Sequence, residues 1–198
     1  NFLKDNMEEL NIQSLEYRYK LPKTNNITKK LIKIMIEKKT NLCFSADIVD
    51  FKKLIEIVGK IGKHICLLKI HYDIIEGFTE KLGLLLKKMA NKLNFLIFED
   101  RKYNDIGNTF NKQLLNKNYN FKSWCDIVSI KSLNERFYKF NKIDIGIIII
   151  SDMSNENNNY FLDDIIYEYN NYKIKKINED SEDLVGIVTQ KNNLNNPS

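Results

Sequence analysis

The chain has 198 residues, of which 43% are hydrophobic and 29% charged, and its formal net charge is +5. This length is enough to bury one good core, so we expect a single domain. The lysines are spread along the chain without a dense basic block, and the longest apolar run, 145–150, is too short to span a bilayer, so we expect neither a nucleic-acid partner nor a membrane segment.

The beginning of the chain is polar. Residues 1–22 are predicted to be a lead-in or linker ending at Pro22, residues 23–191 the folded domain, and residues 192–198 an Asn-rich tail. No secretory signal is visible at the start. Within the domain, apolar residues recur at helical spacing over 27–38, which predicts an amphipathic helix at one end of the domain.

Short apolar segments alternate with helical stretches through the rest of the domain. Their apolar residues are continuous instead of alternating with polar ones, as expected for a parallel sheet covered on both faces. The predicted strands span 42–45, 65–70, 95–98, 127–130, 146–150 and 184–188. The predicted helices span 51–61, 78–93, 109–116, 133–140 and 160–169.

Two architectures produce such a series, an open doubly wound sheet and a (β/α)8 barrel. A dinucleotide-binding sheet carries a Gly-rich turn after its first strand, but this chain reads Ser45-Ala46-Asp47 there. Polar residues instead follow several strands, as in a barrel whose strand ends converge on one face. The sequence therefore predicts an α/β fold of TIM-barrel type, with about six of the eight β/α units. The polar residues are Ser45, Asp47, Lys69, His71, Asp100, Lys102, Asp152 and Ser154.

A cluster of charges follows the third predicted strand. Asp100 and Lys102 are two positions apart, so we expect both side chains on the same side of an extended backbone. Lys69 and Asp47 end neighbouring strands and are expected to join them in an alternating array of carboxylates and ammonium groups. Such an array can hold a lysine protonated and press a carboxylate against an anionic substrate group. A salt-bridge network that merely closes the sheet end is the structural alternative.

Four segments resemble the orotidine 5'-monophosphate decarboxylase family. They are NLCFSAD at 41–47, ICLLKIHYDI at 65–74, FLIFEDRKYNDIGNT at 95–109 and WCDIV at 124–128. The resemblance extends from about Leu21 to Gln190 and is strongest to the eukaryotic form, including the decarboxylase half of bifunctional UMP synthase. It implies decarboxylation of orotidine 5'-monophosphate to UMP in pyrimidine biosynthesis, by a homodimeric (β/α)8 barrel that uses no cofactor and no metal.

The resemblance also implies a role for each matching residue. Lys102 would donate a proton to C6 of the pyrimidine, and Asp100 would lie against the substrate carboxylate. Asp105 would cross the dimer interface into the partner's site and complete the array with Lys69. Apart from the resemblance, the position of His71 next to a charged strand end predicts that it orients its neighbours and is not a base. Further positions match substrate contacts: Ser45 and Asp47 at the base and ribose, Ile106 and Thr109 lining the partner's site, and Ser154 at the pyrimidine edge.

The chain departs from the family pattern in several places. Ser129-Ile130-Lys131 stands where the family has Asn-Ala-His, and Ile70 replaces a Thr. The loop 155–159 lacks the family's lid sequence, and the Gln, Tyr and Gly-Arg residues of the family's phosphate grip have no match. Two alternatives therefore stay open. One is a catalytically impaired barrel that acts as a dimerisation or regulatory partner, and the other is a related barrel enzyme that acts on sugar phosphates with Mg²⁺.

The remaining residues with distinctive chemistry are expected to be structural. Cys43, Cys66 and Cys125 are odd in number and lack zinc spacing, so they are predicted to be reduced core residues of a cytoplasmic protein. Trp124 is expected to pack against the barrel wall.

Overall fold

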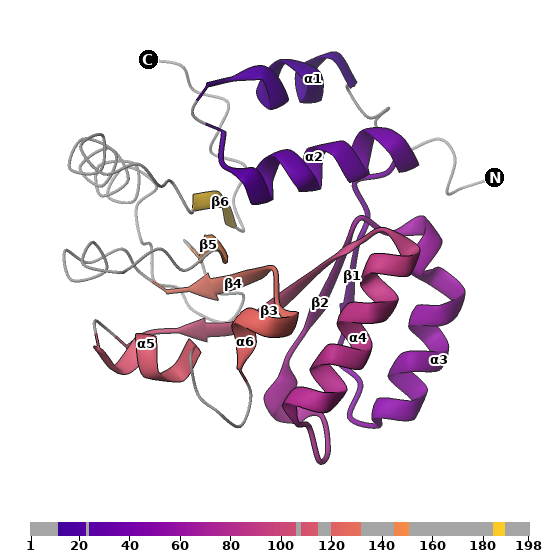
Figure 1. The fold of residues 1–198 in the computed structure, drawn as a ribbon, viewed down its shortest axis with the longest axis vertical. Coiled ribbons are helices and arrows are strands. Elements are labelled where there is room, and N and C mark those ends of the chain that lie inside the picture. The colour runs from indigo at the N-terminus through magenta and orange to yellow at the C-terminus, as the bar shows by residue number, and fades with distance from the viewer. Residues whose placement is uncertain are drawn as a thin grey trace, which may run out of the picture.

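The centre of the fold is a six-stranded parallel sheet whose strands lie side by side in chain order (Figure 1). The computed structural model describes residues 12–22, 24–105, 108–114, 120–131, 145–150 and 184–188. Consecutive parallel strands with helical connections are the arrangement of a (β/α)8 barrel, so the predicted fold class with six of its strands is confirmed. The strands are β1 (Cys43–Ala46), β2 (Leu67–Ile70), β3 (Leu96–Tyr103), β4 (Ile127–Ile130), β5 (Gly146–Ile150) and β6 (Leu184–Val188).

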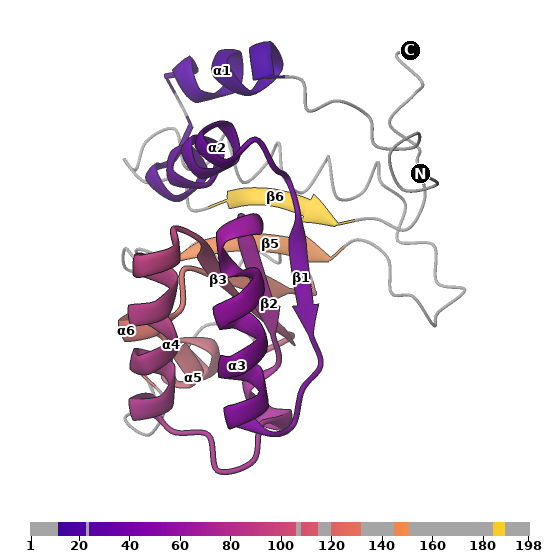
Figure 2. The same cartoon turned by 90° about the vertical axis from the view of Figure 1, so that its right-hand side faces the viewer.

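Helices cover one side of this sheet. α3 (Phe51–Ile61) and α4 (Glu80–Leu93) lie next to each other along the first strands (Figure 2). None of the described helices is long and apolar enough to cross a membrane. The predicted helices 133–140 and 160–169 lie outside the described residues. The other described helical segments that follow β1 in the chain are η1 (Gly62–His64), η2 (Tyr72–Ile74), α5 (Asn108–Leu114) and α6 (Phe121–Trp124).

α2 (Asn26–Lys38) closes the amino end of the sheet, and α1 (Ile12–Lys20) lies on the outer side of α2 (Figure 1). α2 matches its prediction, and the side chain of Asn25 caps it by accepting a hydrogen bond from the Thr28 amide. α2 buries Ile34 among inward-facing strand residues. α1 lies within the predicted polar lead-in, for which no helix or strand was predicted. Leu15 is its one buried residue, too little apolar periodicity to predict a helix.

The ammonium group of Lys38 fastens α2 to the rest of the fold. It donates hydrogen bonds to the carbonyls of Gly62 at 2.8 Å, Ile65 at 2.6 Å, Leu93 at 2.9 Å and Asn94 at 3.0 Å. Burial lowers the pKa of Lys38. These carbonyls lie in the two connections that lead into β2 and β3. The Lys38 side chain therefore links both connections to α2.

Side chains of the strands alternate between two cores. The outward residues, such as Leu68 and Ile97, pack with α3 and α4, while the inward residues, such as Leu67 and Leu96, pack with α2. Alternate residues of a strand share a face, so this register also places the polar groups at the carboxyl ends. The inward positions there are Ser45, Lys69, Asp100 and Ser129.

Trp124 packs in a space left by Gly83 of α4. The indole is fully buried, and its ring centroid lies 5.1 Å from that of Phe78. A Cβ atom at Gly83 would lie 2.5 Å from the indole. The expected packing of Trp124 is confirmed, and its partner is the helix that covers the sheet.

Gly83→Ala is therefore expected to destabilise the protein, by about 1–3 kcal/mol, because the new methyl group overpacks against the indole. Gly59→Ala in α3 is the matched control, since a Cβ there would meet nothing nearer than Met89 at 4.0 Å. That change should stabilise the protein by roughly 0.5–1 kcal/mol through helix propensity. Urea unfolding of both variants checks this pair, and equal effects would contradict the packing described.

Candidate active site

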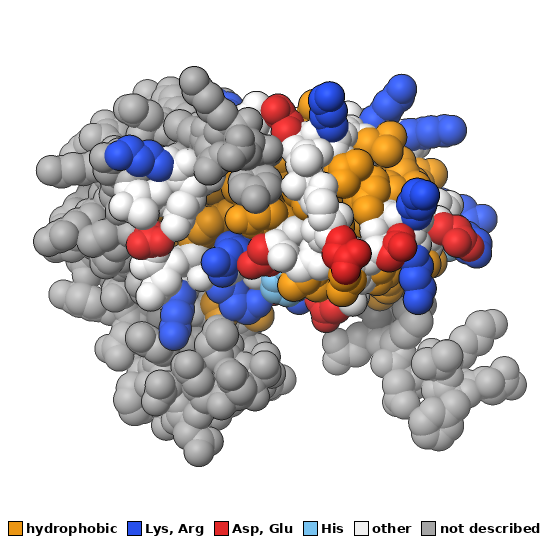
Figure 3. Space-filling model, turned by 90° about the horizontal axis from the view of Figure 1, so that it is seen from below, with side chains coloured by type: hydrophobic (Ala, Val, Ile, Leu, Met, Phe, Trp, Pro, Cys, Tyr) orange, Lys and Arg blue, Asp and Glu red, His pale blue; other side chains and the backbone are white. Residues whose placement is uncertain are grey.

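Charged side chains converge at the carboxyl ends of β1, β2 and β3. Lys69 lies near the end of β2 with His71 just beyond it, and Asp100 and Lys102 belong to β3. Viewed from the side opposite α1 and α2, acidic, basic and histidine side chains meet near the middle of this face (Figure 3). In barrel proteins this end of the strands carries the active site.

Asp100 is the centre of the cluster. Its Oδ2 atom accepts hydrogen bonds from Lys102 Nζ at 2.7 Å and from Lys69 Nζ at 3.1 Å. The Nε2 atom of His71 lies 3.7 Å from the same oxygen and 3.8 Å from Oδ1 of Asp47. The side chain of Asp100 is only 6% exposed, so two ammonium groups share one largely buried carboxylate. The structure thus brings Lys69, Asp100 and Lys102 together as the sequence predicted.

The backbone that achieves this is not the extended one expected from the sequence. The predicted strand ends at residue 98, but β3 continues to Tyr103. Lys102 has a φ of 55°, in the left-handed region that side chains other than Gly seldom occupy. The pairing of β3 with β4 also shifts register between Glu99 and Tyr103. A β-bulge, and not simple i, i+2 alternation, therefore brings the Lys102 amine back onto Asp100.

The surroundings of Asp100 favour its charged form. Burial by itself raises the pKa of this carboxyl, but Lys102, Ser129 and Lys69 together outweigh burial and leave the pKa below its ordinary value. Folding stability from this group is therefore present above the ordinary aspartate pKa and is lost as the pH falls through the lowered one. Near neutral pH, Asp100 is an ionised carboxylate.

Ser45 of β1 and Asp47, which directly follows that strand, flank the cluster. Ser45 pairs in register with Lys69, and both Ser45 and Asp47 are exposed, Asp47 with 69% of its side chain. Asp47 meets the cluster through His71. These two residues line the approach to the buried charges, where a bound molecule could contact them.

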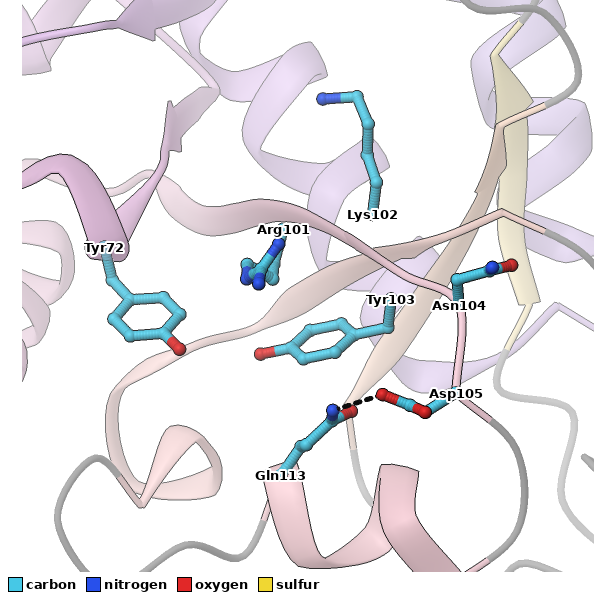
Figure 4. A pocket seen from close by; sticks show the side chains of 7 residues that line it. All are labelled: Tyr72, Arg101, Lys102, Tyr103, Asn104, Asp105 and Gln113. Atoms are coloured by element: carbon cyan, nitrogen blue, oxygen red, sulfur yellow. Dashed lines mark hydrogen bonds between the residues drawn. The ribbon is translucent and has the colours of Figure 1, made fainter.

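Asp105 does not join the Asp100 cluster within this chain. Its Oδ2 atom accepts a hydrogen bond from Gln113 Nε2 of α5 at 2.5 Å. Both residues line a pocket of about 240 Å³ together with Tyr72, Arg101, Lys102, Tyr103 and Asn104. The amine end of Lys102 points away from Asp105 and Gln113 (Figure 4). Thr109 is exposed on α5. Ile106 and Ser154, two other predicted site residues, lie outside the described residues.

A second polar group on β3 was missed by the sequence analysis. Glu99 faces outward and is completely buried, and its Oε2 atom accepts a hydrogen bond from the Arg101 amide at 3.1 Å. Burial raises the pKa of Glu99 to about 8, and the nearby Asp73 carboxylate adds to that rise. Burial also raises the pKa of Tyr103, which shares this face. The sheet thus holds a protonated carboxylic acid, Glu99, next in the chain to the ionised Asp100.

Glu99 should make folding stability depend on pH. Between about pH 4.5 and pH 8 the unfolded chain ionises Glu99 while the folded chain keeps it protonated. The free energy of unfolding should therefore fall as the pH rises, by up to about 1.4 kcal/mol per pH unit from this group. Glu99→Gln removes that slope, because the amide does not ionise.

The measurement is urea unfolding of wild type and Glu99→Gln at pH 5 and pH 8. The advantage of the variant should grow toward pH 8, whereas Glu76→Gln, at an exposed carboxyl, is the matched control. If the free energies of unfolding of wild type and Glu99→Gln differed by the same amount at both pH values, Glu99 would not be protonated in the folded protein.

The three cysteines are free thiols. Cys66 and Cys125 are buried as predicted, but Cys43 is exposed, so the prediction of a core residue is wrong there. Cys43 occupies an inward position of β1, at the edge of the described sheet, where no described strand covers it. In the described part of the chain, no group of three or more His, Cys, Asp or Glu residues is arranged to hold a metal ion.

The fold and the cluster define a class of protein: a TIM-barrel-type α/β protein with lysines and a carboxylate paired at the carboxyl ends of its strands. Residues 40–196 match the family described as Orotidine 5'-phosphate decarboxylase / HUMPS family. The chain belongs to this family.

Curated relatives agree with this assignment. The orotidine 5'-phosphate decarboxylase of Pichia kudriavzevii is 34% identical over 178 residues, which cover 84% of this chain and 66% of that protein. The uridine 5'-monophosphate synthase of Bos taurus is 44% identical over 112 residues, which cover 57% of this chain and 23% of that protein. The chain thus spans just under two thirds of the first relative and less than a quarter of the second.

Solved structures support the fold alone. A putative orotidine 5'-phosphate decarboxylase from Streptomyces avermitilis aligns with a TM-score of 0.60 at 13% identity, covering 86% of this chain and 72% of that one. A putative orotidine-monophosphate-decarboxylase from Plasmodium yoelii aligns with a TM-score of 0.53 at 12% identity, covering 82% of this chain and 74% of that one.

Proposed function

We propose that this protein decarboxylates orotidine 5'-monophosphate to UMP, as part of pyrimidine biosynthesis in the cytoplasm. The observation that carries the proposal is the Asp100 carboxylate shared by Lys102 and Lys69 at 2.7 Å and 3.1 Å. Membership of the family and the names of the curated relatives support the same substrate.

The reaction uses the charges of the cluster in sequence. Asp100 is ionised, so a substrate carboxylate placed against it is repelled while the rest of the nucleotide is held. The bond between C6 and the carboxylate breaks, CO2 leaves, and the electron pair remains on C6. The ammonium of Lys102 then transfers a proton to C6 and regains one from solvent. Lys69 keeps the Asp100 oxygen in place and balances its charge.

The other predicted residues bind the nucleotide. Ser45 and Asp47 contact the base and ribose, His71 orients Asp47 and Asp100, and Ser154 contacts the pyrimidine edge. The roles of Ser45, Asp47 and Ser154 follow the family resemblance, and the exposure of Ser45 and Asp47 beside the cluster supports theirs. The role of His71 is supported by its position between the two carboxylates.

The active form is a homodimer in which each chain contributes to the other's site. Asp105, Ile106 and Thr109 cross the interface in this proposal. Within its own chain, Asp105 points away from Lys102 and accepts a hydrogen bond from Gln113. This orientation supports a role for Asp105 outside the Asp100 cluster of its own chain. Neither a metal nor another cofactor takes part.

The experiment is the conversion of orotidine 5'-monophosphate by the purified full chain, followed by the release of CO2 and the formation of UMP. We expect turnover that EDTA does not reduce. Activity that requires added Mg²⁺ would instead favour sugar-phosphate chemistry through an enediolate. Absence of turnover by a folded protein would favour a non-catalytic barrel that serves as a dimerisation or regulatory partner.

A further inference from the structure

The bulge in β3 leaves backbone amides without strand partners. Glu99 pairs with Val128 and Tyr103 pairs with Ile130, so the three residues between them on β3 face Ser129 alone on β4. In a regular parallel ladder the amides of one strand donate to carbonyls of its neighbour. Residues 100–102 cannot all do so, and a buried amide without an acceptor is costly.

Side chains supply acceptors in the bulge. The amide of Lys102 donates to the Oγ atom of Ser129 at 2.9 Å, and the amide of Arg101 donates to Oε2 of Glu99 at 3.1 Å. Ser129 and Glu99 are both fully buried, one on each face of the sheet. The Ser129 bond is the one that reaches Lys102 itself, at the residue with the left-handed φ.

The left-handed conformation decides where the Lys102 amine goes. Residues two apart on an extended strand are separated by about 6.6 Å along the strand, with roughly parallel side chains. Here Lys102 Nζ instead returns to within 2.7 Å of Asp100 Oδ2 and 3.3 Å of the Asp100 carbonyl oxygen. A non-Gly residue in this conformation is strained by about 1–3 kcal/mol, so surrounding contacts must hold it.

We propose that Ser129 is a positioning residue for the decarboxylation, because its hydroxyl holds the Lys102 backbone in the left-handed conformation that aims the amine at Asp100. The inference rests on the proposed function. Ser129 touches neither the reacting carbon nor its leaving group in this account, and it acts through Lys102.

Apolar inward-facing side chains lie next to Ser129, so packing alone does not explain a hydroxyl at this position. Ile127, the preceding inward residue of β4, and Phe98 and Ile148 on the adjacent strands are apolar. A methyl or isopropyl group would suit such a site, whereas a buried hydroxyl is costly unless it is hydrogen-bonded. The hydroxyl accepts from the Lys102 amide, so its own proton is available to Asp100, whose pKa the Ser129 side chain lowers. One hydroxyl thus holds the Lys102 backbone and also favours the charged form of Asp100.

The test compares Ser129→Ala with Ser129→Thr, which keeps a hydroxyl. Ser129→Ala should lower kcat about 10- to 100-fold with KM within about twofold, because the substrate contacts remain while the proton donor is misaligned. Ser129→Thr should recover most of the lost kcat. Ser129→Val, which matches threonine in shape, controls for the added bulk and should behave as Ser129→Ala does. Circular dichroism verifies that each variant is folded.

A second readout does not depend on activity. Hydrogen exchange of the Lys102 amide, measured by NMR, should be protected in wild type and Ser129→Thr and faster by at least about tenfold in Ser129→Ala. If wild type shows no turnover but the amide behaves as described, the proposed function fails while the backbone contact stands. If wild type turns over and Ser129→Ala keeps its kcat, or if the valine and threonine variants are equally impaired, the positioning role is overturned.

Discussion

Lys102→Ala is expected to lower kcat/KM for orotidine 5'-monophosphate by at least about 10³-fold. The substitution removes the group assigned as the proton donor to C6 and one of the two ammonium groups that hold Asp100. Binding of UMP should weaken much less, because the contacts to base and ribose are left in place. Steady-state kinetics and isothermal titration with UMP measure the two effects.

The matched control for that variant is Lys88→Ala, at an exposed lysine of α4 far from the cluster in the fold. It removes the same charge and side chain from the surface and should retain wild-type activity. If Lys102→Ala and Lys88→Ala turned over at the same rate, Lys102 would have no part in the chemistry.

Asp100→Asn is expected to lower kcat by roughly 10²- to 10³-fold without raising KM. Asparagine is close to aspartate in shape but uncharged, so it removes the repulsion against the substrate carboxylate and loosens Lys69 and Lys102. Loss of repulsion in the bound substrate strengthens its binding while it slows the reaction. The ratio of affinities for orotidine 5'-monophosphate and UMP should therefore shift toward the carboxylated nucleotide.

Asp73→Asn provides the comparison for Asp100→Asn. Asp73 lies 3.2 Å from Arg101 Nε in a partly exposed ion pair. Surface pairs of this kind contribute little, so the affinity ratio should not change. A raised KM with unchanged kcat in Asp100→Asn would mean that Asp100 only binds the substrate.

The strands and the covering helices were predictable because their residues pack on both faces of a parallel sheet. The continuous apolar runs placed β4, β5 and β6 at their observed bounds, and the periodicity of 51–61 gave α3 its observed bounds. α1 was missed because Leu15 is the one buried residue in its nine, which leaves no amphipathic pattern to detect. α1 packs on α2, and a contact with another helix does not show in the spacing of apolar residues within α1 itself.

The candidate site was predictable only in part. Residue types and strand ends were enough to bring Lys69, Asp100 and Lys102 together, yet the reason expected for the last pair was wrong, since Lys102 is not extended. A bulge depends on which amides find side-chain acceptors, and that is a tertiary property. A polar residue at an inward position of an apolar strand was the available signal for Ser129, and an acidic residue in a buried strand was the signal for Glu99.

The most direct test of the central claim is exchange of the C6 hydrogen of UMP in D2O, followed by proton NMR. If the Lys102 ammonium delivers the proton to C6, the reverse transfer must use the same group, so wild type should replace that hydrogen with deuterium while Lys102→Ala should not. Lys88→Ala should exchange at the wild-type rate. Exchange in Lys102→Ala as fast as in wild type would contradict the account, because another group would then serve C6.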